Sequence, residues 1–205
     1  MTSLKTPLQN GFFPSMNDEL SPKFKQFHLN IHSSIGPSIN GFGFTYPPVP
    51  FSTIGEQILE DCPSTSLSKE FCTQRLNIPL ESIVEITLTA YAESVGTRHY
   101  HPVHIHGNAF FVIAYGYGTH QNSSAADPIV NNPTFSCDPE SLKCSKTKRI
   151  GKLIDFNYIN PPKRTTVLVP TGGYVVLRFK ADNPGMWPLH CHVLSHSLSG
   201  EFIFM

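Results

Sequence analysis

The spacing of apolar residues predicts a chain made mostly of short β-strands. Apolar side chains occupy every second position over residues 83–90, and the same alternation appears over residues 27–31. A period of two residues is typical of a strand with one buried face. Runs rich in aromatic or β-branched residues predict further strands at 108–115, 165–169, 173–179 and 200–205, and we expect another to carry Cys191. Because turn-forming residues separate these runs, we expect an all-β sandwich or barrel.

The segments between these runs predict connections. Residues 36–51 contain repeated Gly and Pro and predict an irregular connection, whereas residues 53–60 predict a short helix. Residues 116–149 are polar and predict a long loop. Residues 1–24 predict a linker or the tail of a preceding domain. The remaining residues, 25–205, are then one domain with a core of its own.

Composition and charge exclude several classes of function. Fifteen basic residues balance fifteen acidic ones, and charged residues make up only 15% of the chain. A neutral chain gives no electrostatic reason to expect nucleic acid or an anionic membrane as a partner. No apolar run is long enough for a membrane-spanning helix.

A cluster of His residues surrounds one Cys near the end of the chain. Residues 190–196 read His-Cys-His-Val-Leu-Ser-His. In a strand, His190 and His192 face one side and Cys191 faces the other. A short turn after the strand would bring His196 back toward Cys191. One strand would therefore present metal ligands on both of its surfaces.

A second cluster repeats this arrangement. Residues 101–107 read His-Pro-Val-His-Ile-His-Gly, so His104 and His106 share a face that His101 does not. The simplest assembly joins His101, Cys191 and His196 around one metal, which is the ligand set of blue-copper electron-transfer sites. A separate, all-imidazole site would then contain His104, His106, His190 and His192. A zinc site or another His cluster has no need of a Cys between two His residues.

These motifs resemble those of the multicopper oxidases, specifically the C-terminal cupredoxin domain of laccase-like enzymes. Further similar stretches are Ile39-Asn40-Gly41, residues 170–174 and Asn183-Pro184-Gly185, so the resemblance covers roughly residues 25–205. It implies a Greek-key cupredoxin sandwich with copper as cofactor. It also implies a type 1 copper at His101, Cys191 and His196, a type 2 copper at His104, and a type 3 pair at His106, His190 and His192.

The resemblance further implies an oxidoreductase. Copper takes electrons from a small reductant, such as a phenol, an aromatic amine or a metal ion, and dioxygen is reduced to water. Within this activity, Cys191, His190 and His192 form the catalytic electron path between the two copper sites.

Two features depart from the family pattern. The axial position of the type 1 copper usually carries Met, Leu or Phe, and here it carries Glu201. An ionised carboxylate there would favour Cu(II) and lower the reduction potential, unless Glu201 turns outward and Phe202 covers the metal. The other half of the trinuclear site, which an N-terminal cupredoxin domain supplies in the family, is missing. We therefore expect the chain to be a fragment that is inactive by itself.

The remaining cysteines bear on location. Cys62, Cys72, Cys137 and Cys144 allow three pairings, of which the two local ones are the simplest. All four lie in stretches that predict exposed loops. Disulfides there would indicate an oxidising compartment, and we expect an extracellular, secreted protein.

Two other functions stay open at this point. The chain could be a stand-alone electron-transfer cupredoxin that uses only the His101, Cys191 and His196 copper. It could also be an inactive paralogue, in which Glu201 marks the loss of type 1 function.

Overall fold

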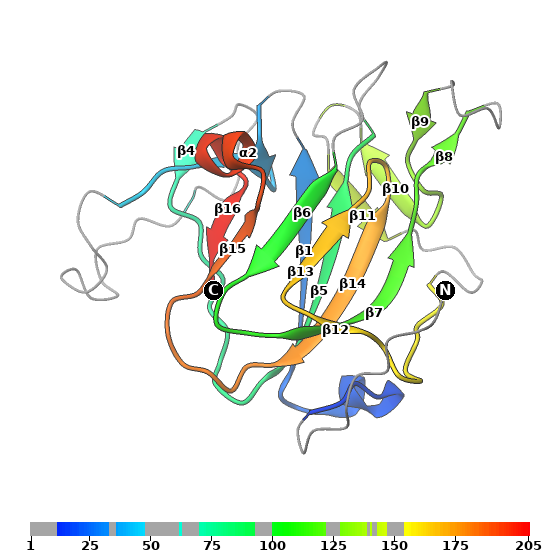
Figure 1. Cartoon of the computed structure of the whole chain (residues 1–205), viewed down its shortest axis with the longest axis vertical. Coiled ribbons are helices and arrows are strands. Elements are labelled where there is room, and N and C mark those ends of the chain that lie inside the picture. Colours follow the sequence, from blue (N-terminus) through cyan, green and yellow to red (C-terminus); the bar gives the residue numbers. More distant parts are fainter. Residues whose placement is uncertain are drawn as a thin grey trace.

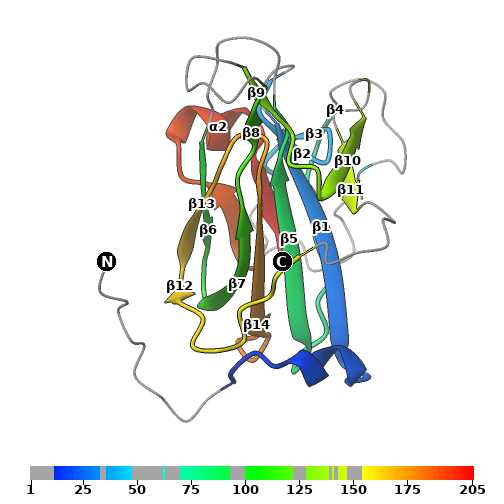
Figure 2. The same cartoon turned by 90° about the vertical axis from the view of Figure 1, so that its right-hand side faces the viewer.

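The computed structural model describes residues 12–32, 36–47, 62, 70–92, 100–121, 128–138, 140, 143–146 and 154–205. In these ranges the chain forms two main sheets packed face to face, with two small two-stranded ribbons beside them (Figures 1 and 2). The larger sheet has the strand order β12-β7-β14-β5-β1-β2-β3-β4, and the smaller has the order β13-β6-β15-β16. Among the described residues, no helix is long and apolar enough to cross a membrane.

The larger sheet consists of β1 (Phe24–His32), β2 (Ser38–Ile39), β3 (Phe42–Phe44), β4 (Glu70–Cys72), β5 (Ile83–Ala90), β7 (Phe110–Gly116), β12 (Lys163–Arg164) and β14 (Tyr174–Lys180). The smaller sheet consists of β6 (His101–Ile105), β13 (Thr166–Val169), β15 (Pro188–Cys191) and β16 (Phe202–Phe204). Two ribbons pair β8 (Thr119–His120) with β9 (Ile129–Val130), and β10 (Phe135–Asp138) with β11 (Lys143–Lys146). The helices are the 3-10 helix η1 (Met16–Leu20) and α2 (Leu194–Ser199).

The main core lies between the two sheets. The inward face of β5 contributes the alternating residues that the sequence predicted, Val84, Ile86, Leu88 and Ala90. They pack with Val103 and Ile105 of β6 and Leu189 of β15. Each such fully buried aliphatic side chain contributes about 1.5–3 kcal/mol. The strands that carry the His motifs are thus held on a packed core.

The opposite face of the larger sheet is also covered. Val176 of β14 and Ile113 of β7 point away from the main core and pack with Phe135 and Cys144 of the β10–β11 ribbon. Strands β7 and β14 are therefore apolar on both faces, which explains their nearly continuous apolar sequence.

Two predicted connections contain regular structure. Residues 36–51 include the β2–β3 hairpin. Its turn is formed by Asn40 and Gly41, whose φ of 55° and 85° place Ile39 opposite Phe42. An Asn-Gly pair in this conformation is a preferred two-residue hairpin turn. The predicted loop at 116–149 includes four short strands, β8 to β11. The helix predicted at 53–60 lies outside the described residues.

The cysteines form the two local disulfides, Cys62–Cys72 and Cys137–Cys144. The prediction that all four lie in exposed loops is wrong for the second pair. Cys137 and Cys144 face each other across β10 and β11, and Cys144 is buried. The ribbon packs on the larger sheet, which buries Cys144 and leaves Cys137 half-buried.

Helix η1 packs against the domain at the end that lies farthest from α2 (Figures 1 and 2). The guanidinium of Arg178 on β14 is fully buried, contacts Glu85 of β5 and lies 3.0 Å from Asp18 of η1. Arg178 also donates to the carbonyl oxygen of Ser15 at 2.7 Å. These contacts attach residues 15–18 to the larger sheet, and the domain boundary itself stays a prediction.

Candidate metal centre

Strands β6 and β15 bring the two His motifs side by side. They are antiparallel neighbours in the smaller sheet, with His104 opposite His190 and Val103 opposite Cys191. Beyond the paired residues, the amide of His106 donates to Pro188 and the amide of His192 donates to Pro102, at 2.9 and 2.6 Å. This register fixes which side chains share a face, because a shift of one residue would reverse every side chain.

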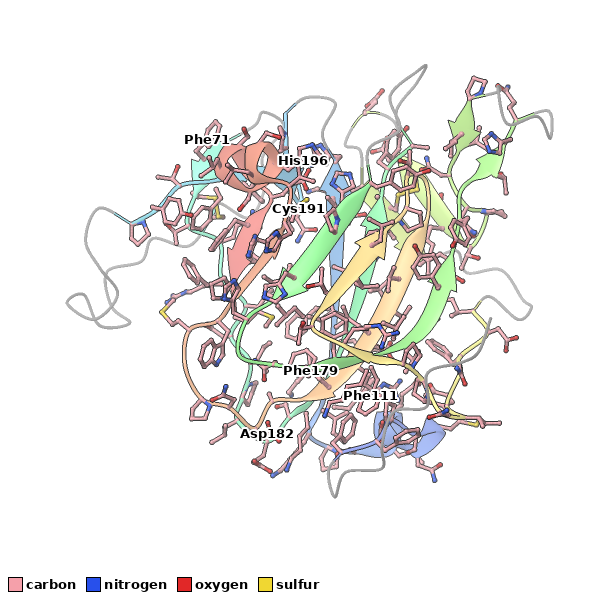
Figure 3. The ribbon with its side chains drawn as sticks, viewed as in Figure 1. Phe71, Phe111, Phe179, Asp182, Cys191 and His196 are labelled. Atoms are coloured by element: carbon pink, nitrogen blue, oxygen red, sulfur yellow. A yellow bond between two sulfur atoms is a disulfide. The ribbon has the colours of Figure 1, made fainter. Side chains whose placement is uncertain are left out.

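The three residues predicted to hold the type 1 copper meet at one end of these strands. His101, Cys191 and His196, together with Glu201, each offer a ligand atom, and these atoms all lie within 4.8 Å of one another. Cys191 Sγ lies 3.6 Å from His196 Nδ1. Figure 3 shows Cys191 and His196 next to each other beside α2. A thiolate and two imidazoles are the donor set that copper prefers in electron-transfer sites, so these residues fit the metal.

Helix α2 returns His196 to the cluster. The helix begins just after Cys191, and the carbonyl oxygen of His196 accepts from the amides of Gly200 and Glu201, at 3.1 and 3.0 Å. Gly200 has φ of 138°, and a Cβ there would lie 2.4 Å from the carbonyl oxygen of Pro37. Glycine is therefore required at this close approach.

Glu201 turns into the cluster. Its side chain is fully buried, and Oε2 accepts a hydrogen bond from Nδ1 of His101 at 2.8 Å. The alternative in which Glu201 turns outward and Phe202 covers the metal is wrong. Phe202 points to the other side of the strand and stacks on His190, with ring centroids 5.5 Å apart.

Burial determines the protonation of the thiol. Burial, followed by the nearby carboxylate of Glu201, raises the pKa of Cys191 to about 12. The metal-free thiol therefore keeps its proton at neutral pH. A bound metal ion would displace that proton, because metals bind the thiolate.

The four other His residues of the two motifs form a second cluster, which we call the His quartet: His104, His106, His190 and His192. The His106 and His190 Nε2 atoms are 3.1 Å apart, and the ring centroids of His104 lie 4.7 to 5.9 Å from those of the other three. His106 and His192 are exposed, whereas His104 and His190 are half-buried. The quartet thus forms an open, all-imidazole surface at the edge of the domain, and its donor set suits copper.

Hydrogen bonds orient two rings of the quartet. Nδ1 of His104 donates to the carbonyl oxygen of Thr165 at 2.8 Å, and Thr166 Oγ1 lies equally close. Nδ1 of His190 donates to the carbonyl oxygen of Cys191 at 2.9 Å. Because a carbonyl only accepts, Nε2 of each ring is left as the metal-binding atom. Thr165 and Thr166 lie 61 and 62 positions from His104 and belong to no motif, so no signal in the sequence pointed to them.

Two rings of the quartet have lowered pKa values, which favour the binding of a metal cation. Burial lowers the pKa of His190. The hydrogen bond to the Cys191 carbonyl raises this pKa, and the neighbouring imidazoles lower it. Burial, followed by His104 and His192, also lowers the pKa of His106. Both rings therefore favour the neutral form, which is the form that binds metal.

Comparisons with known proteins agree with this geometry. The chain matches the multicopper oxidase family over residues 47–203. It is 34% identical to Laccase-3 of Oryza sativa subsp. japonica over 93% of this chain and 28% of that protein. It is 32% identical to Laccase-11 of Arabidopsis thaliana over 75% of this chain and 22% of that protein. The chain thus spans only about a quarter of the length of these relatives.

Solved structures support the same fold. Fet3p, described as a multicopper oxidase that functions in iron import, aligns with a TM-score of 0.52 and 25% identity over 87% of this chain and 30% of that one. The laccase of Botrytis aclada aligns with a TM-score of 0.51 and 21% identity over 89% of this chain and 28% of that one. The predicted cupredoxin sandwich is confirmed. The chain therefore belongs to the multicopper oxidase family, whose metal is copper.

Proposed function

We propose that this chain is the C-terminal copper domain of a laccase-like oxidase. His101, Cys191 and His196 would hold the type 1 copper. His104 holds the type 2 copper, and His106, His190 and His192 bind the type 3 pair. Copper bound at these sites takes single electrons from a reduced substrate and delivers them to dioxygen, which becomes water.

The position of Cys191 between the two clusters carries this proposal. Its sulfur lies in the buried cluster, and its backbone neighbours, His190 and His192, belong to the quartet. The two metal sites are therefore joined by covalent bonds of adjacent residues. A stand-alone electron-transfer protein has no use for four gathered imidazoles beside the thiolate site, so the quartet favours the oxidase.

The quartet supplies only half of a trinuclear site. Its exposed face is open to a second set of imidazoles, which we assign to an N-terminal cupredoxin domain. By itself the chain would bind the type 1 copper and lack oxidase activity. The substrate would be a phenol, an aromatic amine or a metal ion. The two disulfides support an extracellular location, because such bonds persist in oxidising compartments.

Copper loading of the purified chain tests the type 1 assignment. We expect one tightly bound copper with a thiolate-to-copper absorption band in the visible range, and we expect Cys191→Ser to lose that band. Ser136→Ala, in the β10–β11 ribbon, serves as a control and should keep it. A band that persists in Cys191→Ser would contradict the assignment.

Oxygen consumption tests the oxidase assignment. The chain would replace the C-terminal domain of a laccase relative, so that it is joined to that relative's whole N-terminal portion, and the joined protein would be supplied with copper and a phenol. We expect oxygen consumption by the joined protein and none by the chain alone. Substitution of His104 and His106 by Ala in the joined protein should abolish oxygen consumption and leave the thiolate band in place. Consumption that continues without these two residues would refute the assignment.

A further inference from the structure

The buried cluster contains a carboxylate where the family resemblance implies an apolar or thioether side chain. Glu201 is fully buried, and the His101 and Cys191 beside it are 2% and 1% exposed. An ionised carboxylate is costly to bury unless a cation or several hydrogen bonds compensate it. The position of this carboxylate therefore requires an explanation.

The backbone directs Glu201 toward the thiol. Strands β15 and β16 are paired so that His190 lies opposite Phe202, and one residue further the amide of Cys191 donates to the carbonyl oxygen of Glu201 at 3.0 Å. Side chains that lie opposite each other share a face of the sheet. The carboxylate and the sulfur consequently point to the same side, while Phe202 points to the quartet side.

The distances match those between ligands of one metal ion. Glu201 Oε2 lies 3.6 Å from His196 Nδ1, which itself lies 3.6 Å from Cys191 Sγ. Tetrahedral coordination with ordinary metal–nitrogen, metal–oxygen and metal–sulfur bonds places such atoms about 3.3–3.6 Å apart. The 2.8 Å contact between His101 Nδ1 and Glu201 Oε2 is shorter, and it is a hydrogen bond whose proton a metal ion would replace.

We propose that Glu201 is a fourth ligand of this centre, which is then a site of two imidazoles, one thiolate and one carboxylate. The inference deepens the proposed function, since it rests on His101, Cys191 and His196 holding a metal. A carboxylate is a harder and more charged donor than the weak axial ligand of a blue-copper site. It stabilises divalent ions, so the centre should favour Cu(II) over Cu(I) and accept Co(II) with tetrahedral geometry.

Cobalt provides a test that does not depend on oxidase activity. Anaerobic titration of the chain with Co(II) should give an intense d–d spectrum typical of four-coordinate cobalt and a thiolate charge-transfer band. In Glu201→Leu we expect the d–d bands to change and the Co(II) affinity to fall at least ~10-fold, as losses around metal ligands commonly do. Glu81→Gln removes an exposed carboxylate that pairs with Lys180 and should leave both unchanged.

Glu201→Gln distinguishes a Glu201 that coordinates the metal from a Glu201 that only accepts a hydrogen bond from His101. Its amide oxygen still accepts from His101 but lacks the carboxylate charge. If Glu201 is a ligand, this variant should bind Co(II) more weakly than the unchanged chain and give shifted d–d bands, because a neutral amide oxygen is a weaker donor than a carboxylate. A spectrum and a Co(II) affinity within about twofold of the unchanged chain would overturn the proposal. The absence of any thiolate band in the unchanged chain would instead refute the metal centre and the proposed function with it.

One measurement on the unchanged chain covers the case in which a variant fails to fold. Infrared difference spectra of the protein labelled with 13C-glutamate report which carboxylates change when Co(II) binds. We expect one glutamate carboxylate stretch to shift at one equivalent of metal. A spectrum without such a shift, in a sample that shows the thiolate band, would overturn the ligand assignment.

Discussion

Gly107 lies against the indole of Trp187, so closely that a Cβ on Gly107 would lie 2.2 Å from an indole carbon. The indole nitrogen donates to the carbonyl oxygen of Asn183 at 3.0 Å, and the Asn183 amide donates to the Gly107 carbonyl oxygen at 2.8 Å. These contacts hold the turn after β6 against the segment before β15. They therefore help to fix the distance between His106, which precedes Gly107, and His190, which follows Trp187.

Gly107→Ala should lower the free energy of unfolding by about 2–4 kcal/mol, because it adds a clash to a residue with φ of 66°. Trp187 is the sole tryptophan, so its fluorescence reports directly how far the added methyl group displaces the indole. Gly41→Ala is the matched control. Gly41 has φ of 85°, but its added Cβ would meet only Lys143, at 3.8 Å, so we expect about 1 kcal/mol from strain alone. Equal costs in denaturant unfolding would contradict this account of Gly107.

Arg178→Met should destabilise the chain by about 3–5 kcal/mol, because it leaves the buried carboxylate of Glu85 without its cation. The exposed pair of Lys180 and Glu81 provides the comparison, since Lys180→Met should cost at most ~1 kcal/mol. Denaturant unfolding measures both.

A double variant identifies the cause. Arg178→Met with Glu85→Leu removes both charges, so we expect it to be more stable than Arg178→Met alone. A double variant that is less stable would show that packing, and not the uncompensated carboxylate, dominates the loss.

Alternation and spacing predicted much of the fold and the assembly of the site. The period-two pattern of residues 83–90 was sufficient to place β5 and its buried face. Strand parity likewise separated Cys191 from His190, since a strand has only two faces. The Asn40-Gly41 turn carried a recognisable hairpin signal, but the surrounding prolines led to a prediction of irregular structure.

Other features had no signal in the sequence. The order of a polar residue, Glu201, and an apolar one, Phe202, allowed either side chain to face the buried cluster, and contacts with His101 and His196 hold Glu201 there. The partners of Arg178 lie up to 163 positions away in the chain. Local patterns do not encode such pairings, because they depend on which strands become neighbours in the sheet.

The metal-free chain should lose stability as the pH falls below the unfolded pKa of histidine, near ~6.5. Burial lowers the folded-state pKa of His190, so the unfolded chain takes up protons first and the folded state is disfavoured. The stability is fully present above pH ~6.5 and declines toward the folded pKa. His190→Gln should reduce the drop in melting temperature between pH 7 and pH 5, whereas His120→Gln on β8 should not. An unchanged drop in His190→Gln would assign the acid sensitivity to other groups.

The two disulfides should differ in their contribution despite similar loop lengths. Their sequence separations are 10 and 7, for which loop-closure entropy gives each about 2.5 kcal/mol. Cys144 is also buried in the cluster on the opposite face of the larger sheet, and its backbone amide donates to Oδ1 of Asn30 on β1 at 2.6 Å. Replacing Cys137 and Cys144 by Ala should therefore cost more than replacing Cys62 and Cys72, by ~1 kcal/mol or more. Denaturant unfolding of the two double variants measures the difference, and the reverse order would show that the ribbon is held by other contacts.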